Sequence, residues 1–307
     1  MKIYNLGDIK ELRCGTVVTV GMFDGVHAGH RHLLSSLLSS AQCRELEPVV
    51  VTFDRHPRLV VNADESMRLL STYDERLHIL ESCGVENLVI VRFDRETAEM
   101  SACEFTRKVL VPRLGMKVLL LGYDNMFGSR RENDFDQLPL LSEEYGFEIC
   151  RDDAVVVDGV TVSSTKIRAA LIRGEMSVAN AMLGALYSVS GVVVHGRHVG
   201  RSLGFPTANV VPDDRLKMMP KAGVYALKAY YGDRMYKAMA NLGTQPTFHN
   251  DYPVLEVHLL DFEGDLYGKR IIVEFVERLR DTVEFGSVEE LSSQLAEDQR
   301  NVEQIIM

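Results

Sequence analysis

The sequence Thr-Val-Val-Thr-Val-Gly-Met-Phe-Asp-Gly-Val-His-Ala-Gly-His, residues 16–30, leads from a β-branched run through a glycine turn into a helical pattern. Its HxGH portion places His27 and His30 three apart at the start of the helix, where backbone N–H groups lack intrahelical partners. That end of a helix carries partial positive charge and attracts phosphate. Gly25 and Gly29 let the backbone approach a ligand closely. The stretch therefore predicts a phosphate site after a buried strand, and simple packing of the histidines in the turn is the alternative.

Outward from this stretch, short β-branched runs alternate with helical patterns over the first 180 residues or so. This alternation indicates a parallel sheet with helices on both faces, and continuous apolar strands are typical of such a sheet. The predicted strands are Thr16–Val20, Val49–Phe53, Leu88–Val91, Val118–Gly122 and Glu148–Cys150, and the predicted helices are Ala28–Cys43, Tyr73–Cys83 and Ser101–Leu110.

The second part of the chain has a different texture. Two short helical segments, Thr165–Arg173 and Val178–Met182, are followed by strands that alternate apolar and polar residues with short connections. This pattern indicates an antiparallel barrel or sandwich. We place the boundary near Gly184, which gives domains 1–184 and 185–307. Examples of the predicted strands are Val224–Tyr230, Met235–Ala240, Leu255–Leu260 and Ile271–Val276, and a last helix, Ser287–Ile306, is expected to open with a capping box of Ser287 and Glu290.

Composition excludes several classes of protein. A chain of 307 residues with 46% apolar and 25% charged residues is expected to fold as two globular domains. No apolar run approaches the roughly 20 residues of a membrane span, and the acidic N-terminus does not resemble a signal peptide, so we expect a cytoplasmic protein. The net charge of −10 argues against nucleic acid as a partner. The five cysteines are expected to be reduced, mostly buried thiols.

A second phosphate signal is Ser163-Ser164-Thr165-Lys166-Ile167-Arg168. Hydroxyl groups stand at the cap of a predicted helix, and Lys166 and Arg168 fall in its first turn, where cations oppose the helix dipole. A bound polyphosphate would resolve that conflict. A third signal is the glycine- and arginine-rich loop between Gly191 and Asn209, which lacks the GK[ST] of a Walker A motif. It suits a backbone cradle for phosphates, with Thr207 and Asn209 offering neutral oxygens to magnesium, although such loops are often surface turns.

Taken together, these motifs resemble those of the bacterial bifunctional riboflavin kinase/FMN adenylyltransferases (FAD synthetases) along essentially the whole chain. The matching stretches are GMFDGVHAGH (21–30), TFDRHP (52–57), GYDNMFG (122–128) and SSTKIR (163–168) in the first half, and residues 191–209, 223–225, 241–247, 255–258, 265–268 and 279–298 in the second. The resemblance implies an α/β Rossmann-like nucleotidylyltransferase domain, followed by an antiparallel β-barrel riboflavin kinase domain with a C-terminal helix.

The resemblance also implies the chemistry and its residues. Riboflavin and ATP would give FMN, and FMN and a second ATP would give FAD, with Mg²⁺ in both steps. His27 and His30 would act at the α-phosphate, and Glu256 would deprotonate the riboflavin 5′-hydroxyl. The ATP and phosphate ligands would be Gly21, Phe23, Asp24, Gly29, Ser163, Ser164, Thr165, Arg168, Gly196, Arg197, Gly200, Arg201, Gly204, Pro206, Thr207 and Asn209, with Thr207 and Asn209 also on the metal. Flavin would contact Asp124, Asn125, Phe127 and Arg280.

Three residues depart from the family pattern and leave alternatives open. Met22, Asn125 and Met126 stand where Asn and aromatic, imidazole or basic residues are usual, so acceptor binding in the adenylyl transfer step is expected to be weaker. One alternative is a kinase with weak or lost adenylyltransferase activity, and another is a non-catalytic flavin-binding regulatory module. An RNA-binding barrel is disfavoured by the acidic charge. No membrane partner is expected, and weak self-association is left open.

Overall fold

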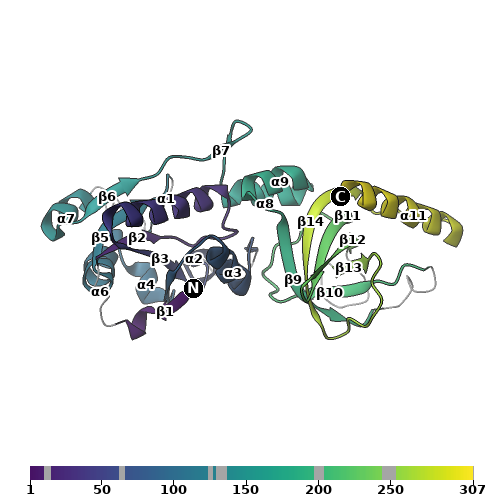
Figure 1. Cartoon of the computed structure of the whole chain (residues 1–307), viewed down its shortest axis with the longest axis horizontal. Helices are drawn as coiled ribbons and strands as arrows, with labels where there is room; N and C mark the ends of the chain where they lie inside the picture. The colour runs from purple at the N-terminus through teal and green to yellow at the C-terminus, as the bar shows by residue number, and fades with distance from the viewer. Residues whose placement is uncertain are drawn as a thin grey trace. The chain divides into compact units, whose positions relative to one another are not determined.

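A six-stranded parallel sheet with the order β1-β4-β3-β2-β5-β6 lies at the centre of the first of two compact units, residues Met1–Ser163 (Figure 1). The computed structural model describes residues 1–9, 15–61, 66–123, 127–128, 137–196, 204–243 and 254–306. The elements of this unit are β1 (Lys2–Asn5), η1 (Leu6–Asp8), β2 (Thr16–Val20), α1 (Ala28–Arg44), β3 (Glu47–Phe53), α2 (Pro57–Val61), α3 (Tyr73–Ser82), β4 (Asn87–Val91), α4 (Arg95–Glu99), α5 (Ala102–Phe105), η2 (Thr106–Leu110), α6 (Val111–Leu114), β5 (Met116–Leu121), α7 (Leu138–Tyr145), β6 (Glu148–Arg151), β7 (Val156–Val157) and β8 (Val160–Thr161).

Both faces of this sheet are buried, as the sequence predicts. Successive strand residues point to opposite faces. Val17 and Val50 pack in one cluster with α1 and α3, whereas Val18 and Leu119 pack in another with α5, η2, α6 and α7. Figure 1 accordingly shows α1 and α6 on opposite sides of the sheet.

The strand order positions the first candidate site. The run β4-β3-β2-β5-β6 is a doubly wound order that reverses between β2 and β5, and ligands of such sheets bind at the carboxyl ends of the strands at that point. The HxGH stretch follows β2, and the described residues 122–123, which begin the GYDNMFG motif, follow β5. The HxGH stretch and the start of the second motif therefore lie at the strand ends where a ligand is expected.

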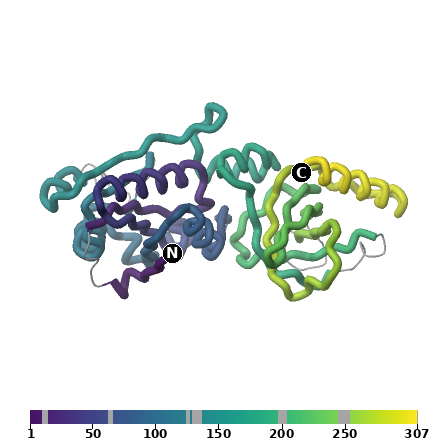
Figure 2. Tube along the Cα trace, in the orientation of Figure 1, coloured from purple at the N-terminus to yellow at the C-terminus, as the bar shows by residue number. Residues whose placement is uncertain are grey.

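The second unit, Ser164–Met307, contains a closed antiparallel barrel with the order β10-β13-β12-β11-β14-β9, which confirms the predicted barrel (Figure 2). Helix α11 lies along the barrel, where Val302 and Ile306 pack against Ala226 and Met239. The elements of this unit are α8 (Ser164–Arg173), α9 (Met176–Leu183), β9 (Tyr187–Val194), β10 (Ala208–Pro212), β11 (Gly223–Tyr231), β12 (Arg234–Gly243), β13 (Val254–Leu259), β14 (Arg270–Arg280) and α11 (Val288–Ile305).

Helices α8 and α9 group with the barrel in the compact unit Ser164–Met307, and the domain boundary near Gly184 stays a prediction. The Asn180 side chain donates to the carbonyl of Phe275 at 2.9 Å and accepts the N–H of Tyr187 at 2.8 Å. The N–H of Lys221 also donates to the carbonyl of Leu171 at 2.9 Å. These bonds tie both helices to barrel strands and loops.

The exposure of the cysteine side chains differs from the prediction. Among the described cysteines Cys103 is buried, but Cys43 is exposed and Cys83 and Cys150 are half-buried, so the prediction of mostly buried thiols is wrong.

Ser287 accepts the N–H of Glu290 at 3.2 Å, but the Glu290 carboxylate accepts from Gly286, so only half of the predicted capping box forms. Across the described part of the chain, every helix is too short or too polar to cross a bilayer.

Candidate active sites

The loop between β2 and α1 holds the two motif histidines face to face. The rings of His27 and His30 stack with centroids 3.6 Å apart and 13° between their planes. His27 caps α1, and its Nδ1 accepts the N–H of His30 at 3.3 Å. Because Nδ1 is the acceptor, a neutral His27 ring carries its proton on Nε2. A β-carbon on Gly29 would lie 3.3 Å from the His27 ring, so glycine leaves room for this arrangement.

The environment of His30 keeps its imidazole uncharged. Burial lowers the pKa of His30 well below its usual value, and the neighbouring His27 lowers it further. Within the described part of the chain, the buried His30 Nδ1 has no hydrogen-bond partner. A buried polar atom without a partner is costly in a folded protein, so this nitrogen is suited to a bound ligand.

Phe23 and Asp24, both predicted to contact ATP, make internal contacts in this loop. The Phe23 side chain is 1% exposed and packs edge-on against His30 at 5.1 Å. The Asp24 carboxylate accepts the N–H groups of Leu70 at 3.2 Å and Ser71 at 3.1 Å, and Gly25 donates to the Ser71 hydroxyl at 2.9 Å. These bonds fix the loop to the segment before α3. Contacts of Gly21, Phe23 and Asp24 with ATP stay predictions.

Sequence reasoning missed Arg76, a buried cation behind the same loop. Arg76 is 2% exposed, and its guanidinium donates to the carbonyls of Met22 at 3.0 Å and Phe53 at 2.6 Å. Burial lowers the pKa of Arg76 to about 10. Arg76 Nη1 also lies 3.4 Å from the sulfur of Met22, so this departure from the family pattern has a partner inside the protein. The sequence of α3 contains no pattern that predicts an inward orientation for Arg76.

The remaining predicted residues of the first site lie in several places. Ser163 ends the first unit, and Ser164, Thr165 and Arg168 open α8 in the second unit, whose first turn has no acidic residue. Their pairing with the histidines stays a prediction, and Asp124, Asn125 and Met126 lie outside the described residues.

The end of the motif after β5 is described. The Phe127 side chain is 6% exposed and packs against Phe105 with ring centres 6.0 Å apart, so contact with flavin stays a prediction. Gly128 has φ +85°, and a β-carbon there would lie 2.8 Å from the Cα of Ala102. Glycine is therefore required at this position.

In the barrel, Glu256 stands between two asparagines. It is paired in register with Asn209 on β10 and with Asn241 on β12. Directly paired residues of antiparallel strands share a face of the sheet. Leu255 and Val257, on either side of Glu256, are fully buried inside the barrel, so Glu256 and its two partners lie on the outer wall.

Two cavities meet at Thr207, one against this outer wall and one lined by residues that include the inward-facing Val257. The first, of about 330 Å³, lies between the wall and α11, and the second is about 500 Å³. The first is lined by Phe205, Thr207, Val224, Met239, Ala240, Asn241, Glu256, His258, Arg280, Thr282, Val283, Phe285, Leu291, Leu295 and Asp298. The second is lined by Val193, Pro206, Thr207, Ala208, Val257, Leu259, Phe262, Gly264, Asp265, Leu266 and Tyr267. This arrangement offers two substrates adjacent sites that meet at Thr207.

The glycine-rich loop is described at its two ends. Gly204 has φ +83°, a conformation that favours glycine, and the carbonyl of Pro206 lies 2.8 Å from Nδ1 of His258. Gly196 packs against Asn209. Arg197, Gly200 and Arg201 lie outside the described residues.

Thr207, at the junction of the cavities, and Asn209, the strand partner of Glu256, suit a hard cation held mainly by its substrate. Over the described residues, no three His, Cys, Asp or Glu side chains gather as a metal site. Mg²⁺, however, keeps several waters and takes one or two protein oxygens together with substrate phosphates. The hydroxyl of Thr207 and the amide oxygen of Asn209, which is 7% exposed, fit that requirement.

Comparisons with known proteins cover both units. The family model described as FAD synthetase matches residues 9–166, and the riboflavin kinase model matches residues 183–306. A bifunctional riboflavin kinase/FMN adenylyltransferase of Escherichia coli (strain K12) is 40% identical over 298 residues, covering 97% of this chain and 94% of the relative. Its counterpart in Haemophilus influenzae is 35% identical over 287 residues, with 92% of each chain covered.

A solved structure agrees over the whole length. The crystal structure titled a macrolide-efflux protein from Streptococcus pneumoniae superposes with a TM-score of 0.89 at 31% identity, and the match covers 99% of both chains. The name of that protein differs from the names of the sequence relatives, although the two comparisons cover nearly the same length of this chain.

Proposed function

This chain belongs to the family of bifunctional riboflavin kinase/FMN adenylyltransferases, and on that premise we propose which of its residues carry each reaction. The enzyme phosphorylates riboflavin with ATP to give FMN, and it then transfers an adenylyl group from ATP to FMN to give FAD and pyrophosphate. A divalent metal is general in these families, and we assign Mg²⁺. The cytoplasmic location, weak self-association and absence of nucleic acid or membrane partners stay predictions.

For the kinase reaction we assign Glu256 as the general base. The register of Glu256 between Asn209 and Asn241, beside the 330 Å³ cavity that shares Thr207 with the neighbouring cavity, is the observation that carries the assignment. Glu256 accepts the proton of the riboflavin 5′-hydroxyl as its oxygen attacks the γ-phosphorus, and ADP leaves. Such a base contributes about 10²–10⁴-fold to a rate.

The two cavities divide the substrates. The 330 Å³ cavity has an apolar lining that includes Val224, Phe285 and Leu295, which suits the isoalloxazine ring of riboflavin. The 500 Å³ cavity takes ATP, with its phosphates toward Thr207, Asn209 and the glycine-rich loop. When bound, Mg²⁺ neutralises charge on these phosphates.

For adenylyl transfer, His27 and His30 act at the α-phosphate. The Nε2–H of a neutral His27 donates to a phosphate oxygen and stabilises the charge that develops as an FMN phosphate oxygen attacks. Ser164, Thr165 and Arg168 hold the β- and γ-phosphates, which leave as pyrophosphate. Asp124, Asn125 and Phe127 are assigned to the FMN acceptor by the family resemblance.

The substitution Glu256→Gln tests the kinase assignment. It should lower riboflavin phosphorylation by about 100-fold or more while riboflavin and ATP still bind, because the amide keeps the shape but accepts no proton. FMN and FAD are resolved by chromatography after incubation with riboflavin, ATP and Mg²⁺. Glu277→Gln, an exposed carboxylate on β14, is the matched control. A variant that keeps more than half of the wild-type rate would exclude Glu256 as the base.

A further inference from the structure

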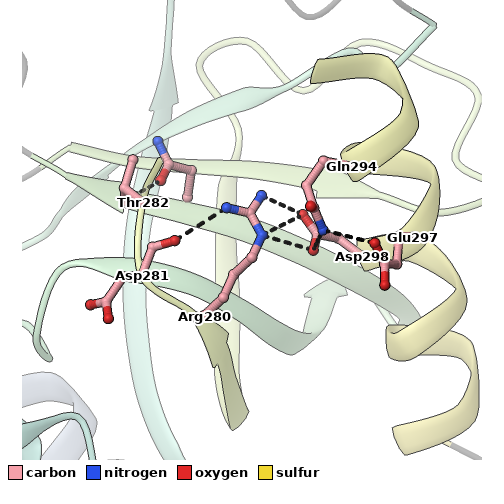
Figure 3. A network of polar contacts seen from close by, with 7 residues as sticks. Arg280, Asp281, Thr282, Gln294, Glu297 and Asp298 are labelled. Atoms are coloured by element: carbon pink, nitrogen blue, oxygen red, sulfur yellow. Dashed lines mark hydrogen bonds and ion pairs between the residues drawn. The ribbon is translucent and has the colours of Figure 1, made fainter. Parts of the chain in front are cut away.

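The buried carboxylate of Asp298, on α11, forms an ion pair with the guanidinium of Arg280 at the wall of the 330 Å³ cavity (Figure 3). The Asp298 side chain is 1% exposed and that of Arg280 is 21% exposed. Nε of Arg280 donates to Oδ1 at 3.0 Å and to Oδ2 at 3.2 Å, and Nη2 donates to Oδ2 at 2.6 Å. A planar fork of this kind fixes the orientation of the guanidinium as well as its distance.

Neighbouring residues hold both partners in place. Nε2 of Gln294 donates to Oδ1 of Asp298 at 3.2 Å. Nη1 of Arg280 donates to the carbonyl of Asp281 at 3.2 Å, and its Cζ lies 5.8 Å from the centre of the Phe285 ring. Moving Arg280 would leave the Asp298 charge buried without its partner, which is strongly unfavourable. The guanidinium is therefore held in one orientation.

The ion pair with Asp298 does not use all the hydrogen-bond donors of the Arg280 guanidinium. A guanidinium has five N–H groups. Among the described residues, the hydrogen bonds of Arg280 use three of them, one each on Nε, Nη1 and Nη2. Two N–H groups remain on a side chain that lines the cavity together with Glu256.

Arg280 and Glu256 stand in one row across the barrel wall. Glu256 pairs with Asn241, Asn241 with Val224, and Val224 with Arg280. Three strand spacings separate the two ends, or about 14 Å along the sheet. Glu256 is the proposed base at one end, and Arg280 offers hydrogen-bond donors at the other. Asn241 and Val224 lie between them in the row, and apolar side chains such as Phe285 and Leu295 line the same cavity.

The order of these groups along the wall matches the order of chemical groups along a riboflavin molecule. With its 5′-hydroxyl at Glu256, the molecule has the length to bring its ring system to Arg280. The apolar side chains suit the ring faces. The carbonyl oxygens of the pyrimidine ring are acceptors, and they match the two remaining N–H groups of Arg280.

We propose that Asp298 is a positioning residue for riboflavin, which holds Arg280 so that its two remaining N–H groups bind a pyrimidine carbonyl oxygen of the flavin. The proposal rests on the assignment of riboflavin to this cavity. Asp298 acts through Arg280 and does not itself bind the flavin. Neutralising Asp298 removes the fork and releases the donors from their position.

The test uses Asp298→Asn in the full chain, with Glu297→Gln as matched control. Glu297 is the adjacent, exposed carboxylate, and it also accepts from Gln294, at 3.3 Å. Asp298→Asn should raise the KM for riboflavin at least about tenfold, the value of one charged hydrogen bond, and leave the KM for ATP within about twofold. Glu297→Gln should leave both constants unchanged. Equal increases in the two KM values in Asp298→Asn would indicate a merely structural role and overturn the proposal.

Two substrate analogues add a readout that general loss of structure does not move. In 2-thioriboflavin and 4-thioriboflavin a carbonyl oxygen is replaced by sulfur, a weaker acceptor. Wild-type enzyme should bind one of them more weakly than riboflavin, and Asp298→Asn should not discriminate. Equal KM values for all three flavins in the wild type, or discrimination kept in Asp298→Asn, would contradict the proposal.

The variant Arg280→Lys keeps the proposal testable if Asp298→Asn folds poorly. Arg280→Lys keeps the charge opposite Asp298 but loses the planar fork, so it too should lose the discrimination, and an Arg280→Lys variant that keeps it would contradict the proposal. Failure of the wild type to convert riboflavin to FMN would instead count against the proposed function, so the two failures are distinct.

Discussion

The side-chain amide of Asn209 fills the space beside Gly196. A β-carbon built on Gly196 would overlap Nδ2 of Asn209 and lie 2.7 Å from its Cγ. Asn209 is 7% exposed and is paired on β10 with Glu256 of the neighbouring strand. Gly196 therefore sets the position of a predicted metal and phosphate ligand, in addition to the phosphate contact that the sequence predicts for it.

Gly196→Ala should impair the kinase and spare the adenylyltransferase. The added methyl group displaces Asn209, and a misplacement of about 1 Å at a reacting site can lower a rate about 100-fold. Overpacking should also destabilise the barrel by about 1–3 kcal/mol. FMN formation from riboflavin and FAD formation from supplied FMN, measured separately, check the prediction.

The stability of a second pair of variants identifies the cause. In an Asn209→Ala background the methyl group has room, so adding Gly196→Ala should cost little further stability. The same loss in both backgrounds, or a wild-type kinase rate in Gly196→Ala, would show that the contact with Asn209 is not what matters.

The barrel should be an independent kinase when its fragment begins at Ser164. A fragment 185–307 lacks α9, which buries Met176, Ala179, Met182 and Leu183 and whose Asn180 bonds to barrel strands. Losing the burial of the three large apolar side chains, Met176, Met182 and Leu183, at about 1.5–3 kcal/mol each should destabilise the shorter fragment by at least about 4.5 kcal/mol. Circular dichroism and riboflavin phosphorylation of both fragments test this. Equal melting temperatures would mean that α8 and α9 are dispensable to the barrel.

The sequence predicts those parts of the fold whose signal is local. The buried strand Thr16–Val20 has the predicted bounds, because a β-branched apolar run between turn residues allows little else. The edge strand β1 was not predicted, since Lys2–Asn5 is mostly exposed and polar and is a strand only through its pairing with β4. The hairpin of β7 and β8 is likewise too short to leave a periodic pattern.

The same limit applies to the candidate sites. HxGH is recognisable because it carries its chemistry within a few neighbouring residues, whereas Glu256 is assigned only through the family resemblance. The inward orientation of Arg76 and the pairing of Arg280 with Asp298, 18 residues further along, depend on tertiary packing. Residues that hold other residues in position therefore become apparent only in the folded chain.

The buried His30 should make the stability of the first unit depend on pH near neutrality. Burial lowers its pKa in the folded state, so below the unfolded pKa of about 6.5 the unfolded chain binds a proton that the folded chain does not. Stability is then fully present above about pH 7 and is lost as the pH falls through 6.5 toward the folded pKa. Between pH 7.5 and 5.5 the loss from this one group is at most about 1.4 kcal/mol. Calorimetry of the full chain at both pH values measures this loss of stability, with the barrel transition assigned from the fragment 164–307.

His30→Asn should remove this part of the loss of stability, whereas His32→Asn, which deletes a half-exposed imidazole of the same helix, should keep it. A pH dependence that survives in His30→Asn would place the titrating group elsewhere in the unit.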